Sequence, residues 1–515
     1  MGIKWEQFEA EAKGKKVFLF GVGADSKLFW LKYDNQIRLT GVIDNDKKKQ
    51  GYAIGDLVIE AWDTQNGRLP ISDISILDCY DKNEIVVLIA SRKYYKQIIE
   101  QLASYDVFKY FVISIMEANE GNNAADLDIT IDNESAKAEY AKVCCKKPIN
   151  IRKIVFYSFR SYSDHGKYIA EALLKTKQEL DLVFFVKDLG TVVPEGVRKV
   201  FIGNWKKYIY EMETAGTWIY NMVAPDYIIK RPGQIYIQTK HWASVTLKKF
   251  YLDASTINVV HKRVDNWKYN SKIMDYIITG SDFDTESCRR GFDFHGEVVQ
   301  VGSPRSDAMF RQEKYKKKIC QHYHIKASTK LLIYAPTYRF QQGSTDYKHE
   351  FKLTDLDLGR VRVTLEQNFG GEWNILLRLH PSVTKESIYM HKPAGVIDVS
   401  GYEDSEELVS ACDMMISDYS SIMFEPAFVK KPVFLFAPDR EEYIDKEYDL
   451  LIDYDTLPFP IALSNEELLT KIKQFDKAEY DRNVTDFLQK YGVCEDGHAS
   501  ERAAEFILRL IAERE

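Results

Sequence analysis

The sequence predicts an α/β protein with three successive α/β units, of which the second and third form two lobes with a cleft between them. The first observation is that short buried-strand patterns alternate with helical patterns along the chain, which implies right-handed crossovers and parallel sheets. The second is the length of 515 residues, which exceeds one ordinary domain. The third is the composition, since 45% hydrophobic and 29% charged residues are typical of a soluble globular protein.

The first unit, residues 1–118, has the element order of a Rossmann-like, mononucleotide-binding domain. A buried-strand pattern is followed by Gly21 and Gly23, then by a helical stretch and a second strand that ends at Asp44. In such a motif the second glycine lets the backbone approach a pyrophosphate, and the acidic residue accepts from a ribose hydroxyl. Ser26 stands where the third glycine is expected. A second interpretation therefore stays open, in which the glycines only form a tight turn and Asp44 only ends a strand.

Residues 119–150 are predicted to be a linker, because the stretch opens with polar, turn-forming residues and closes with a Lys-Pro pair. Residues 151–325 and 326–515 are predicted to be the two lobes. We expect buried strands in the first lobe at 154–159, 182–186, 227–229, 235–238 and 276–279, and in the second at 330–334, 373–378, 396–399, 414–417 and 432–436.

Charge and composition exclude several classes of protein. The formal net charge of −7 argues against a nucleic-acid binder, and the 7 cysteines contain no C-x-x-C pair that would indicate a zinc cluster or a disulfide framework. No stretch reaches the roughly 20 apolar residues of a membrane-spanning helix, and the N-terminus lacks a secretory signal, so we expect a cytoplasmic protein. We interpret the lysine clusters at 13–16, 47–49 and 314–318 as solvated faces. Peripheral attraction to anionic lipids on the cytoplasmic face of the inner membrane is the second interpretation.

Polar residues follow successive strand patterns of the third unit, at the carboxyl ends where a parallel sheet binds its ligands. Arg339 follows the strand at 330–334 and offers a forked set of donors suited to a phosphate. His380 follows the strand at 373–378 and stands before Pro381. It can donate to a diphosphate or shuttle a proton, with a purely structural histidine as the alternative.

The segment Asp418-Tyr419-Ser420-Ser421 gives the strongest local signal, directly after the strand at 414–417. Ser420 or Ser421 can cap a helix that begins there, and the free N–H groups of the first helical turn point at an anion. The segment therefore predicts a phosphate cradle that needs no lysine, with ordinary helix caps as the alternative. Glu425 follows closely and is a candidate acceptor for hydroxyls of a ribose or of the transferred group.

In the second unit the best candidate is His241, which follows the strand at 235–238. We expect His241 to face His380 across the cleft. Arg305 lies where the two lobes join. It is predicted either to contact the phosphates of a donor or to hold the hinge through Asp307.

Four segments together resemble a known family. They are Gly302-Ser303-Pro304-Arg305-Ser306-Asp307, Ala335-Pro336-Thr337-Tyr338-Arg339, Leu379-His380-Pro381 and Ser417-Asp418-Tyr419-Ser420-Ser421. Their order is similar to that in the CDP-glycerol glycerophosphotransferase family, which builds teichoic-acid and capsule-type polymers. The resemblance covers about residues 150–515, so the Rossmann-like N-terminal unit is an addition to it.

The resemblance implies a GT-B architecture, with two Rossmann-like lobes and the nucleotide diphosphate held by the C-terminal one. It also implies the transfer of a polyol phosphate, such as glycerol phosphate, from a CDP-linked donor to a hydroxyl of a cell-surface polymer or of its lipid-linked precursor, with release of CMP. By the same resemblance His241 is the base for the acceptor hydroxyl. His380, Ser420 and Ser421 contact the donor's diphosphate.

The sequence departs from the family around this histidine. Lys240 replaces the usual tryptophan, Trp242 replaces the glycine, and the following run to Lys249 is longer. The transferred polyol and the acceptor therefore stay open. So do two other functions: a nucleotide-sugar glycosyltransferase or 2-epimerase of the same fold, and a non-catalytic scaffold. We expect no required cofactor, because no dedicated metal-ligand cluster is present, although assistance by Mg²⁺ remains open.

Overall fold

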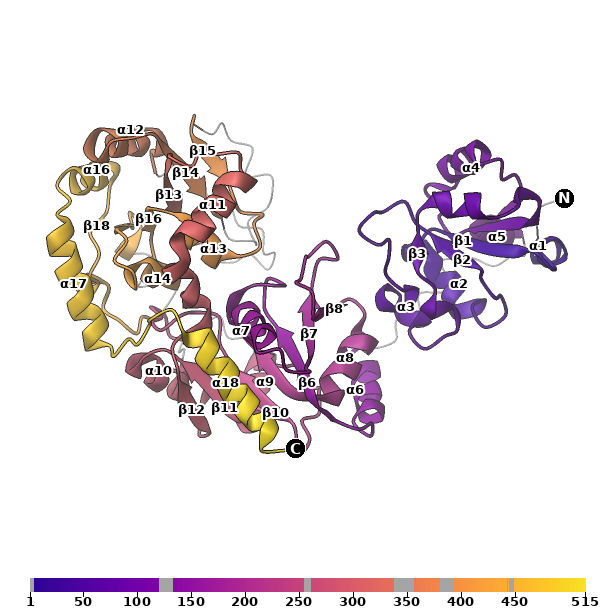
Figure 1. The fold of residues 1–515 in the computed structure, drawn as a ribbon, viewed down its shortest axis with the longest axis horizontal. Coiled ribbons are helices and arrows are strands. Elements are labelled where there is room, and N and C mark those ends of the chain that lie inside the picture. Colours follow the sequence, from indigo (N-terminus) through magenta and orange to yellow (C-terminus); the bar gives the residue numbers. More distant parts are fainter. Residues whose placement is uncertain are drawn as a thin grey trace.

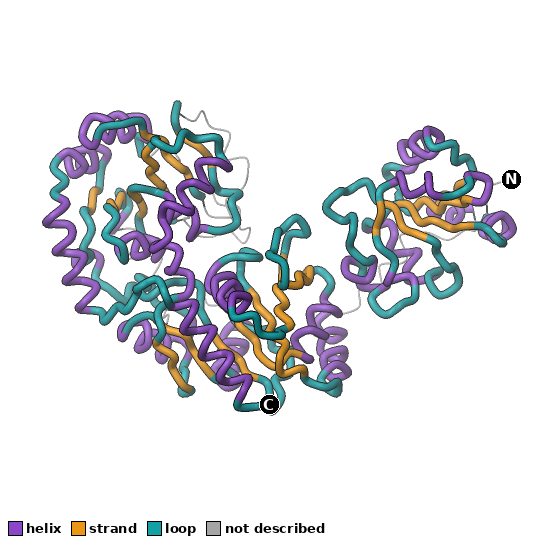
Figure 2. Tube along the Cα trace, in the orientation of Figure 1, coloured by secondary structure: helices purple, strands orange, loops and turns teal. Residues whose placement is uncertain are grey.

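The computed structural model describes residues 4–119, 133–253, 261–337, 356–379, 393–441, 443 and 449–515. Within these residues the chain forms three α/β units, each built on its own parallel sheet, and the middle unit lies between the other two (Figure 1). The strands of each unit are flanked by helices (Figure 2). This arrangement explains the continuous apolar strand patterns, because a parallel sheet covered on both faces has no solvent-facing side.

The N-terminal sheet has the strand order β3-β2-β1-β4-β5, with all neighbours parallel. Its strands are β1 (Lys16–Phe20), β2 (Gly41–Ile43), β3 (Ile71–Ser72), β4 (Ile85–Ile89) and β5 (Tyr110–Val112). Its helices are α1 (Trp5–Ala12), α2 (Lys27–Lys32), α3 (Ile54–Leu57), α4 (Tyr95–Ser104) and α5 (Ile113–Asn119). The strand order reverses between β1 and β4, which creates a crevice at their carboxyl ends.

The middle sheet has the order β12-β11-β10-β9-β6-β7-β8 and is also parallel. Its strands are β6 (Asn150–Tyr157), β7 (Asp181–Val186), β8 (Val197–Phe201), β9 (Ala215–Tyr220), β10 (Ile235–Gln238), β11 (Tyr276–Thr279) and β12 (Glu297–Gln300). The helices are α6 (Asn133–Cys144), α7 (Asp164–Lys175), α8 (Trp205–Thr214), α9 (His261–Ile273) and α10 (Asp282–Phe292).

One predicted strand of the middle unit, residues 227–229, is wrong. The N–H of Ile228 donates to the carbonyl of Pro225 at 3.1 Å in a turn, and Ile228 is fully buried. The apolar run therefore marks a core contact rather than a strand. The strand β9, at the centre of the sheet, was not predicted, because Gly216 interrupts its apolar pattern. A Cβ at Gly216 would lie 2.5 Å from the Cα of Ile151, so only glycine lets β9 pass β6 there.

The C-terminal sheet has the parallel order β15-β14-β13-β16-β17-β18. Its strands are β13 (Lys330–Tyr334), β14 (Trp373–Leu377), β15 (Val396–Asp398), β16 (Met414–Ser417), β17 (Val433–Phe436) and β18 (Ile461–Ala462). The helices that follow β12 are α11 (Gln312–His322), α12 (Leu358–Phe369), α13 (Ser405–Ala411), α14 (Phe424–Ala427), α16 (Asn465–Lys473), α17 (Lys477–Lys490) and α18 (Ala499–Ala512).

The final helix α18 returns to the middle unit and packs in the core that contains Ile154 (Figure 1). Asp307 fixes its start, since the two carboxylate oxygens of Asp307 accept the N–H groups of Ala499 at 2.9 Å and Ser500 at 2.8 Å. Asp307 therefore acts as a helix cap between distant parts of the chain.

The N-terminal unit contacts the middle one directly. The hydroxyl of Tyr52 donates to the carbonyl of Leu189 at 3.0 Å, and the indole of Trp62 donates to the hydroxyl of Tyr140 at 3.0 Å. Tyr140 belongs to α6, which packs into the core of the middle unit. Of the predicted linker, residues 120–132 lie outside the described residues, and the ends of the three domains stay predictions.

Candidate active site

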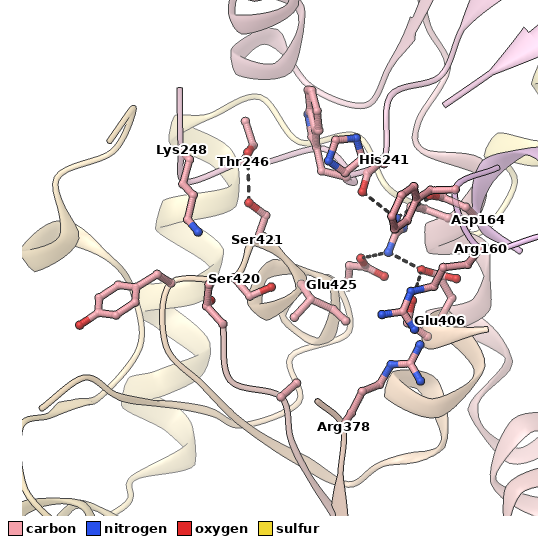
Figure 3. Close-up of a pocket in the computed structure, with 18 of the residues that line it drawn as sticks. Arg160, Asp164, His241, Thr246, Lys248, Arg378, Glu406, Ser420, Ser421 and Glu425 are labelled. Carbon is pink, nitrogen blue, oxygen red and sulfur yellow. Dashed lines mark hydrogen bonds and ion pairs between the residues drawn. The ribbon is translucent and has the colours of Figure 1, made fainter. Parts of the chain in front are cut away.

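A cavity of about 480 Å³ lies between the middle and C-terminal units, at the carboxyl ends of their strands (Figure 3). The middle unit lines it with residues that follow β6 and β10, including Arg160, Asp164, His241, Trp242, Thr246 and Lys248. The C-terminal unit lines it with residues that follow β13, β14 and β16, including Thr337, Arg378, Leu379, Tyr419, Ser420 and Ser421. The two sheets therefore present their ligand-binding edges to one shared space.

His241 stands on one wall of this cavity, three residues after the end of β10. Its side chain is exposed to the cavity, while protein surrounds it on the other sides. Burial is the main cause that lowers the pKa of His241, the cations of Arg305 and Lys240 lower it further, and Asp164 opposes the change. The imidazole is therefore neutral near neutral pH and is able to accept a proton.

The backbone that carries His241 is fixed by buried polar contacts. Lys240 has left-handed backbone (φ 55°), and its ammonium lies 3.0 Å from Asp284 while donating to the carbonyls of Trp242 and Ala243 at 3.2 Å. The Trp242 indole donates to Asp284 at 3.1 Å, and the Nε2 atom of His165 lies 2.9 Å from the Trp242 carbonyl. The two residues that depart from the family pattern therefore share one buried carboxylate as their partner.

Arg305 is buried at the centre of the junction between the lobes. It lies 3.1 Å from Asp164 and 2.8 Å from Glu425, also pairs with Glu406, and donates to the carbonyl of His241 at 3.0 Å. Burial lowers the pKa of Arg305, but the three carboxylates outweigh it and raise that pKa well above its ordinary value. Arg305 thus joins the walls of the cavity through these carboxylates and not through Asp307.

The carboxyl group of Glu425 has a raised pKa, so it holds its proton more strongly than a surface carboxyl group does. Burial is the main cause of the rise, repulsion from Glu406 and Asp164 adds to it, and Arg305 opposes it. Asp164 is held in left-handed backbone (φ 59°), with one carboxylate oxygen accepting from the amide of Asn221 at 2.8 Å. Asp164 thus combines a strained backbone with partners for both carboxylate oxygens, which is typical of a preorganised site.

Two further arginines approach the cavity from opposite lobes. Arg378 follows β14 and donates through Nη1 to the carbonyls of Val399 at 3.1 Å and Tyr402 at 2.7 Å, while its buried Nη2 has no partner among the described residues. Burial, and next the charge of Arg160, lower the pKa of Arg378 to about 9. Arg160 follows β6 and makes no hydrogen bond or ion pair with a described residue. Two neighbouring guanidinium groups with uncommitted N–H donors suit an anion.

The Asp418–Ser421 segment makes hydrogen bonds that hold the protein together and also supplies side chains that line the cavity. Asp418 is buried, and its Oδ1 accepts the N–H groups of Thr337 at 2.8 Å and of Tyr419 at 2.6 Å. Ser421 reaches across the cleft: its hydroxyl accepts from the N–H of Leu247 at 3.1 Å and lies 3.0 Å from the Thr246 hydroxyl (Figure 3). The chain on both sides of the cleft is therefore tied together at this point.

Ser420 occupies the N-cap position of the short 3-10 helix η10 (Ser421–Met423), which runs into α14, yet its side chain makes no capping hydrogen bond. The helix start is thus only a short turn rather than the longer helix that the pattern indicated. The Ser420 side chain lines the cavity and is only partly buried (Figure 3).

The other predicted site residues fall into two groups. Arg339 and His380 lie outside the described residues, so the predicted opposition of His241 and His380 stays a prediction; their neighbours Thr337 and Leu379 line the cavity. Gly21, Gly23 and Asp44 lie together in the N-terminal unit, where they line a separate cavity at the carboxyl ends of β1 and β2.

Several lining residues were not among the predicted ones: Arg160, Asp164, Arg378 and Glu406. A signal existed for the two arginines, since Arg160 directly follows one predicted strand and Arg378 is the last residue of another. No signal distinguished Asp164 and Glu406 from ordinary acidic residues in the first turn of a helix.

The described part of the chain holds no group of three or more His, Cys, Asp or Glu side chains placed to bind a metal ion. No helix within the described ranges is long and apolar enough to cross a membrane. Several lysines of the predicted basic clusters are in ion pairs: Lys48 with Asp188, Lys316 with Asp413 and Lys318 with Glu407. These lysines therefore have acidic partners on the protein itself, and the choice between the two interpretations of the clusters stays a prediction.

Comparison with known proteins matches this sequence to one family. A sequence model of the CDP-glycerol:poly(glycerophosphate) glycerophosphotransferase family matches residues 139–509. A teichoic acid glycerol-phosphate transferase of Staphylococcus aureus is 29% identical over 382 residues, covering 72% of this chain and 95% of that protein. A teichoic acid poly(glycerol phosphate) polymerase of Bacillus subtilis is 28% identical over 376 residues, covering 71% of this chain. The chain spans about half the length of that polymerase and of its Staphylococcus epidermidis counterpart.

Solved structures of the wall teichoic acid polymerase TagF have the same fold. One is 28% identical with a TM-score of 0.65 and covers 75% of this chain and 96% of its own, and another, with a TM-score of 0.64, was soaked with CDPG. The likeness confirms the predicted fold class, a GT-B-type pair of lobes with an added N-terminal Rossmann-like domain. With the family match extending over both lobes and the cleft between them, this chain belongs to the CDP-glycerol:poly(glycerophosphate) glycerophosphotransferase family.

Proposed function

We propose that the chain transfers a polyol phosphate from a CDP-linked donor to a hydroxyl of a teichoic-acid-type polymer or of its lipid-linked precursor. The observation that carries this proposal is the pairing, across one cavity, of the base-competent His241 with the uncommitted N–H donors of Arg160 and Arg378. Membership of the family and likeness to glycerol-phosphate transferases and polymerases support the same reaction.

In this reaction the acceptor hydroxyl attacks the β-phosphorus of the donor. His241 takes the hydroxyl proton as the new phosphorus–oxygen bond forms. The bond from the β-phosphorus to the bridging oxygen breaks, and CMP leaves with that electron pair. The lowered pKa of His241 keeps the imidazole unprotonated, which a general base requires.

The cations of the cavity stabilise the charge that develops on the transferred phosphoryl group and on CMP. Arg160 and Arg378 supply fixed donors from opposite lobes, and the Ser420 hydroxyl supplies another from the C-terminal wall. Arg339 and His380 join them in this proposal, since they come after β13 and β14 in the sequence, two strands of the same sheet. Donors that are fixed before the reaction stabilise a transition state without reorganising.

The remaining predicted donor-binding residues support the site through the protein itself. Arg305 and Glu425 join the two lobes. Asp418 fixes the turn before Ser420, and Ser421 bonds to Thr246 of the opposite lobe. We propose that these four residues set the width of the cleft, which decides whether base and donor meet. The cytoplasmic location of the chain, and its peripheral attraction to the membrane, stay predictions from the sequence.

A donor screen tests the proposal. The purified full chain is incubated with an oligomeric glycerol-phosphate acceptor and CDP-glycerol, CDP-ribitol, a UDP-sugar or a GDP-sugar, and the release of CMP, UDP or GDP is measured. The expected result is CMP release from a CDP-polyol that depends on the acceptor. Turnover of a nucleotide sugar, with none of either CDP-polyol, would overturn the proposal and favour a glycosyltransferase.

A further inference from the structure

The N-terminal unit carries its own cavity, of about 470 Å³, at the carboxyl ends of β1 and β4. We propose that this cavity binds a nucleoside phosphate, with the phosphate against the Gly23–Asp25 backbone and the base beside Tyr94. The cavity lies before residue 139, where the family match begins. This inference does not depend on the proposed transferase reaction.

The position of the cavity is the first argument. In the order β3-β2-β1-β4-β5, the chain runs from β1 to β2 on one side of the sheet and from β4 to β5 on the other side. The loops after β1 and β4 therefore separate. Open parallel sheets bind ligands in the crevice that this reversal produces. The volume falls in the range of about 300–1,000 Å³ that is usual for small-ligand pockets.

The two glycines on the floor of the cavity have different reasons to be glycine. Gly21 has φ +106°, a conformation that other residues rarely adopt. Gly23 has extended backbone (φ −136°, ψ −167°), and a Cβ there would meet nothing within 4 Å. Neither the backbone nor the packing needs a glycine at position 23. Its lack of a side chain leaves open space where a ligand can approach the main chain.

The backbone beyond Gly23 offers donors for a phosphate. The N–H groups of Gly23, Ala24 and Asp25 make no hydrogen bond to a described residue, whereas the N–H groups on either side, of Val22 and Ser26, are bonded. The N–H groups of Ala24 and Asp25 stand at the start of the helical turn that follows the extended Gly23, where successive N–H groups point the same way and suit an anion. The donors therefore point to a phosphate rather than to a cation.

The nearby charges favour an anion as well. Lys93 lines the cavity and has no ion pair with a described acidic residue. The carboxylate of Asp25 turns to Arg92, with contacts of 2.8 Å to its N–H and 3.2 Å to its Nε. Asp44 accepts from the Val22 N–H at 2.7 Å and pairs with Lys49 at 3.3 Å. Both carboxylates thus have partners, whereas the Lys93 ammonium lies 5.0 Å from the centre of the Tyr94 ring and has no acidic partner among the described residues.

The opposite side of the cavity suits a flat ring. Tyr94 is half exposed at its edge, and Val22, Ala90 and Ile98 supply apolar surface. The amide of Gln97 also lines the cavity and makes no hydrogen bond to a described residue. An amide presents both a donor and an acceptor, which is what recognition of a base edge requires. In this arrangement Asp44 shapes the glycine loop through Val22.

Calorimetric titration of the full chain tests this proposal. Wild type is titrated with CMP, UMP, AMP, GMP and inorganic phosphate, alongside the variants Gly23→Val, Lys93→Ala, Lys96→Ala and Arg378→Ala. Lys96 is the matched control, because it is exposed on α4 and does not line the cavity. Arg378→Ala alters the cleft between the lobes and leaves the N-terminal unit unchanged.

At least one nucleotide is expected to bind wild type and Arg378→Ala with equal affinity and more tightly than inorganic phosphate. Gly23→Val is expected to abolish this binding, and Lys93→Ala to weaken it by about tenfold or more, as for a charge-assisted hydrogen bond. Lys96→Ala should match wild type. If Gly23→Val does not fold by circular dichroism, the comparison of Lys93→Ala with Lys96→Ala decides the result.

Three results would overturn the proposal: no nucleotide binding at all, phosphate binding as tightly as every nucleotide, or binding that Arg378→Ala removes and Gly23→Val leaves intact. The last result would assign the nucleotide to the cleft instead. CMP release in the donor screen, measured on the same variants, is expected to be normal in Gly23→Val, so failure here is distinguishable from failure of the transferase proposal.

Discussion

The guanidinium of Arg305, in the segment that joins the lobes, lies 2.8 Å from a carboxylate oxygen of Glu425 in α14 of the C-terminal lobe. Both side chains are buried, and Asp164 of the middle lobe shares the same guanidinium. A single cation thus joins the two walls of the cleft.

Removing that cation should destabilise the two-lobed fold strongly. Arg305→Met leaves buried carboxylates without a partner, which typically costs about 3–5 kcal/mol of unfolding free energy. The double variant Arg305→Met/Glu425→Gln should recover part of the loss, because one unpaired charge is gone. Urea unfolding followed by circular dichroism measures both.

The exposed Arg290→Met, whose partners are Asp253 and Glu286, is the control and should cost about 1 kcal/mol or less. Equal destabilisation of Arg305→Met and Arg290→Met would show that the buried junction contributes no more than a surface ion pair.

Arg378 should act on donor binding, and its loss should also lower stability because the carbonyls of Val399 and Tyr402 lose their Nη1 donor. Replacing it by alanine removes a buried guanidinium with an uncommitted Nη2, so the KM for the donor is expected to rise about 10- to 100-fold. Arg160→Ala should act in the same direction, and the exposed Arg482→Ala should have no effect. Steady-state kinetics of CMP release measure this, and an unchanged donor KM in both cavity variants would remove the arginines from the donor site.

Ser420 and Ser421 are adjacent but should respond differently to alanine. Ser420→Ala removes a hydroxyl that faces the cavity, so it should lower donor affinity without changing stability. Ser421→Ala removes the contacts to Thr246 and Leu247, so it should cost about 1 kcal/mol of stability. Thermal unfolding and donor KM, measured on both variants, separate the two roles. The reverse pattern, with stability lost only in Ser420→Ala, would contradict this division.

Much of the fold could be predicted from the sequence, because the strands of a parallel sheet covered on both faces are continuous apolar runs. The cleft at the strand ends, and the positions of His241 and Ser420 on its walls, agree with that reasoning. The strand β9 could not be seen, since Gly216 serves a close backbone approach that only the folded sheet reveals.

The ion-pair partners within the site could not be predicted from the sequence. Arg305 was expected to pair with its near neighbour Asp307 or with the donor, yet its carboxylate partners come from α7, α13 and α14. Asp307 instead caps α18, which returns from the end of the chain. Local patterns indicate which residue types follow a strand, but not which of them become buried and paired.

Glu495 should make stability depend on pH. Burial is the main cause that raises its pKa from the ordinary 4.5 to about 7, with bonds from Ser244 and Ser303 opposing the rise. Because the pKa is higher in the folded chain, the stabilisation is full below about pH 4.5 and is lost as the pH rises through about 7. Glu495→Gln should therefore reduce the fall in Tm between about pH 5 and about pH 8.

The exposed Glu505→Gln is the matched control for that measurement and should leave the pH dependence of Tm as it is in wild type. A Glu495→Gln profile that runs parallel to wild type across this range would exclude a role for Glu495 in the pH response.

The most direct test of the proposed transfer is the rate of CMP release from CDP-glycerol in the presence of a glycerol-phosphate acceptor, compared between wild type, His241→Ala and His295→Ala. His295 is exposed and pairs only with Asp293 among the described residues, so its variant controls for the loss of a histidine. We predict that kcat falls about 10²- to 10⁴-fold in His241→Ala, the range for loss of a general base, and stays at the wild-type value in His295→Ala. Equal rates in all three proteins would contradict the assignment of His241 as the base.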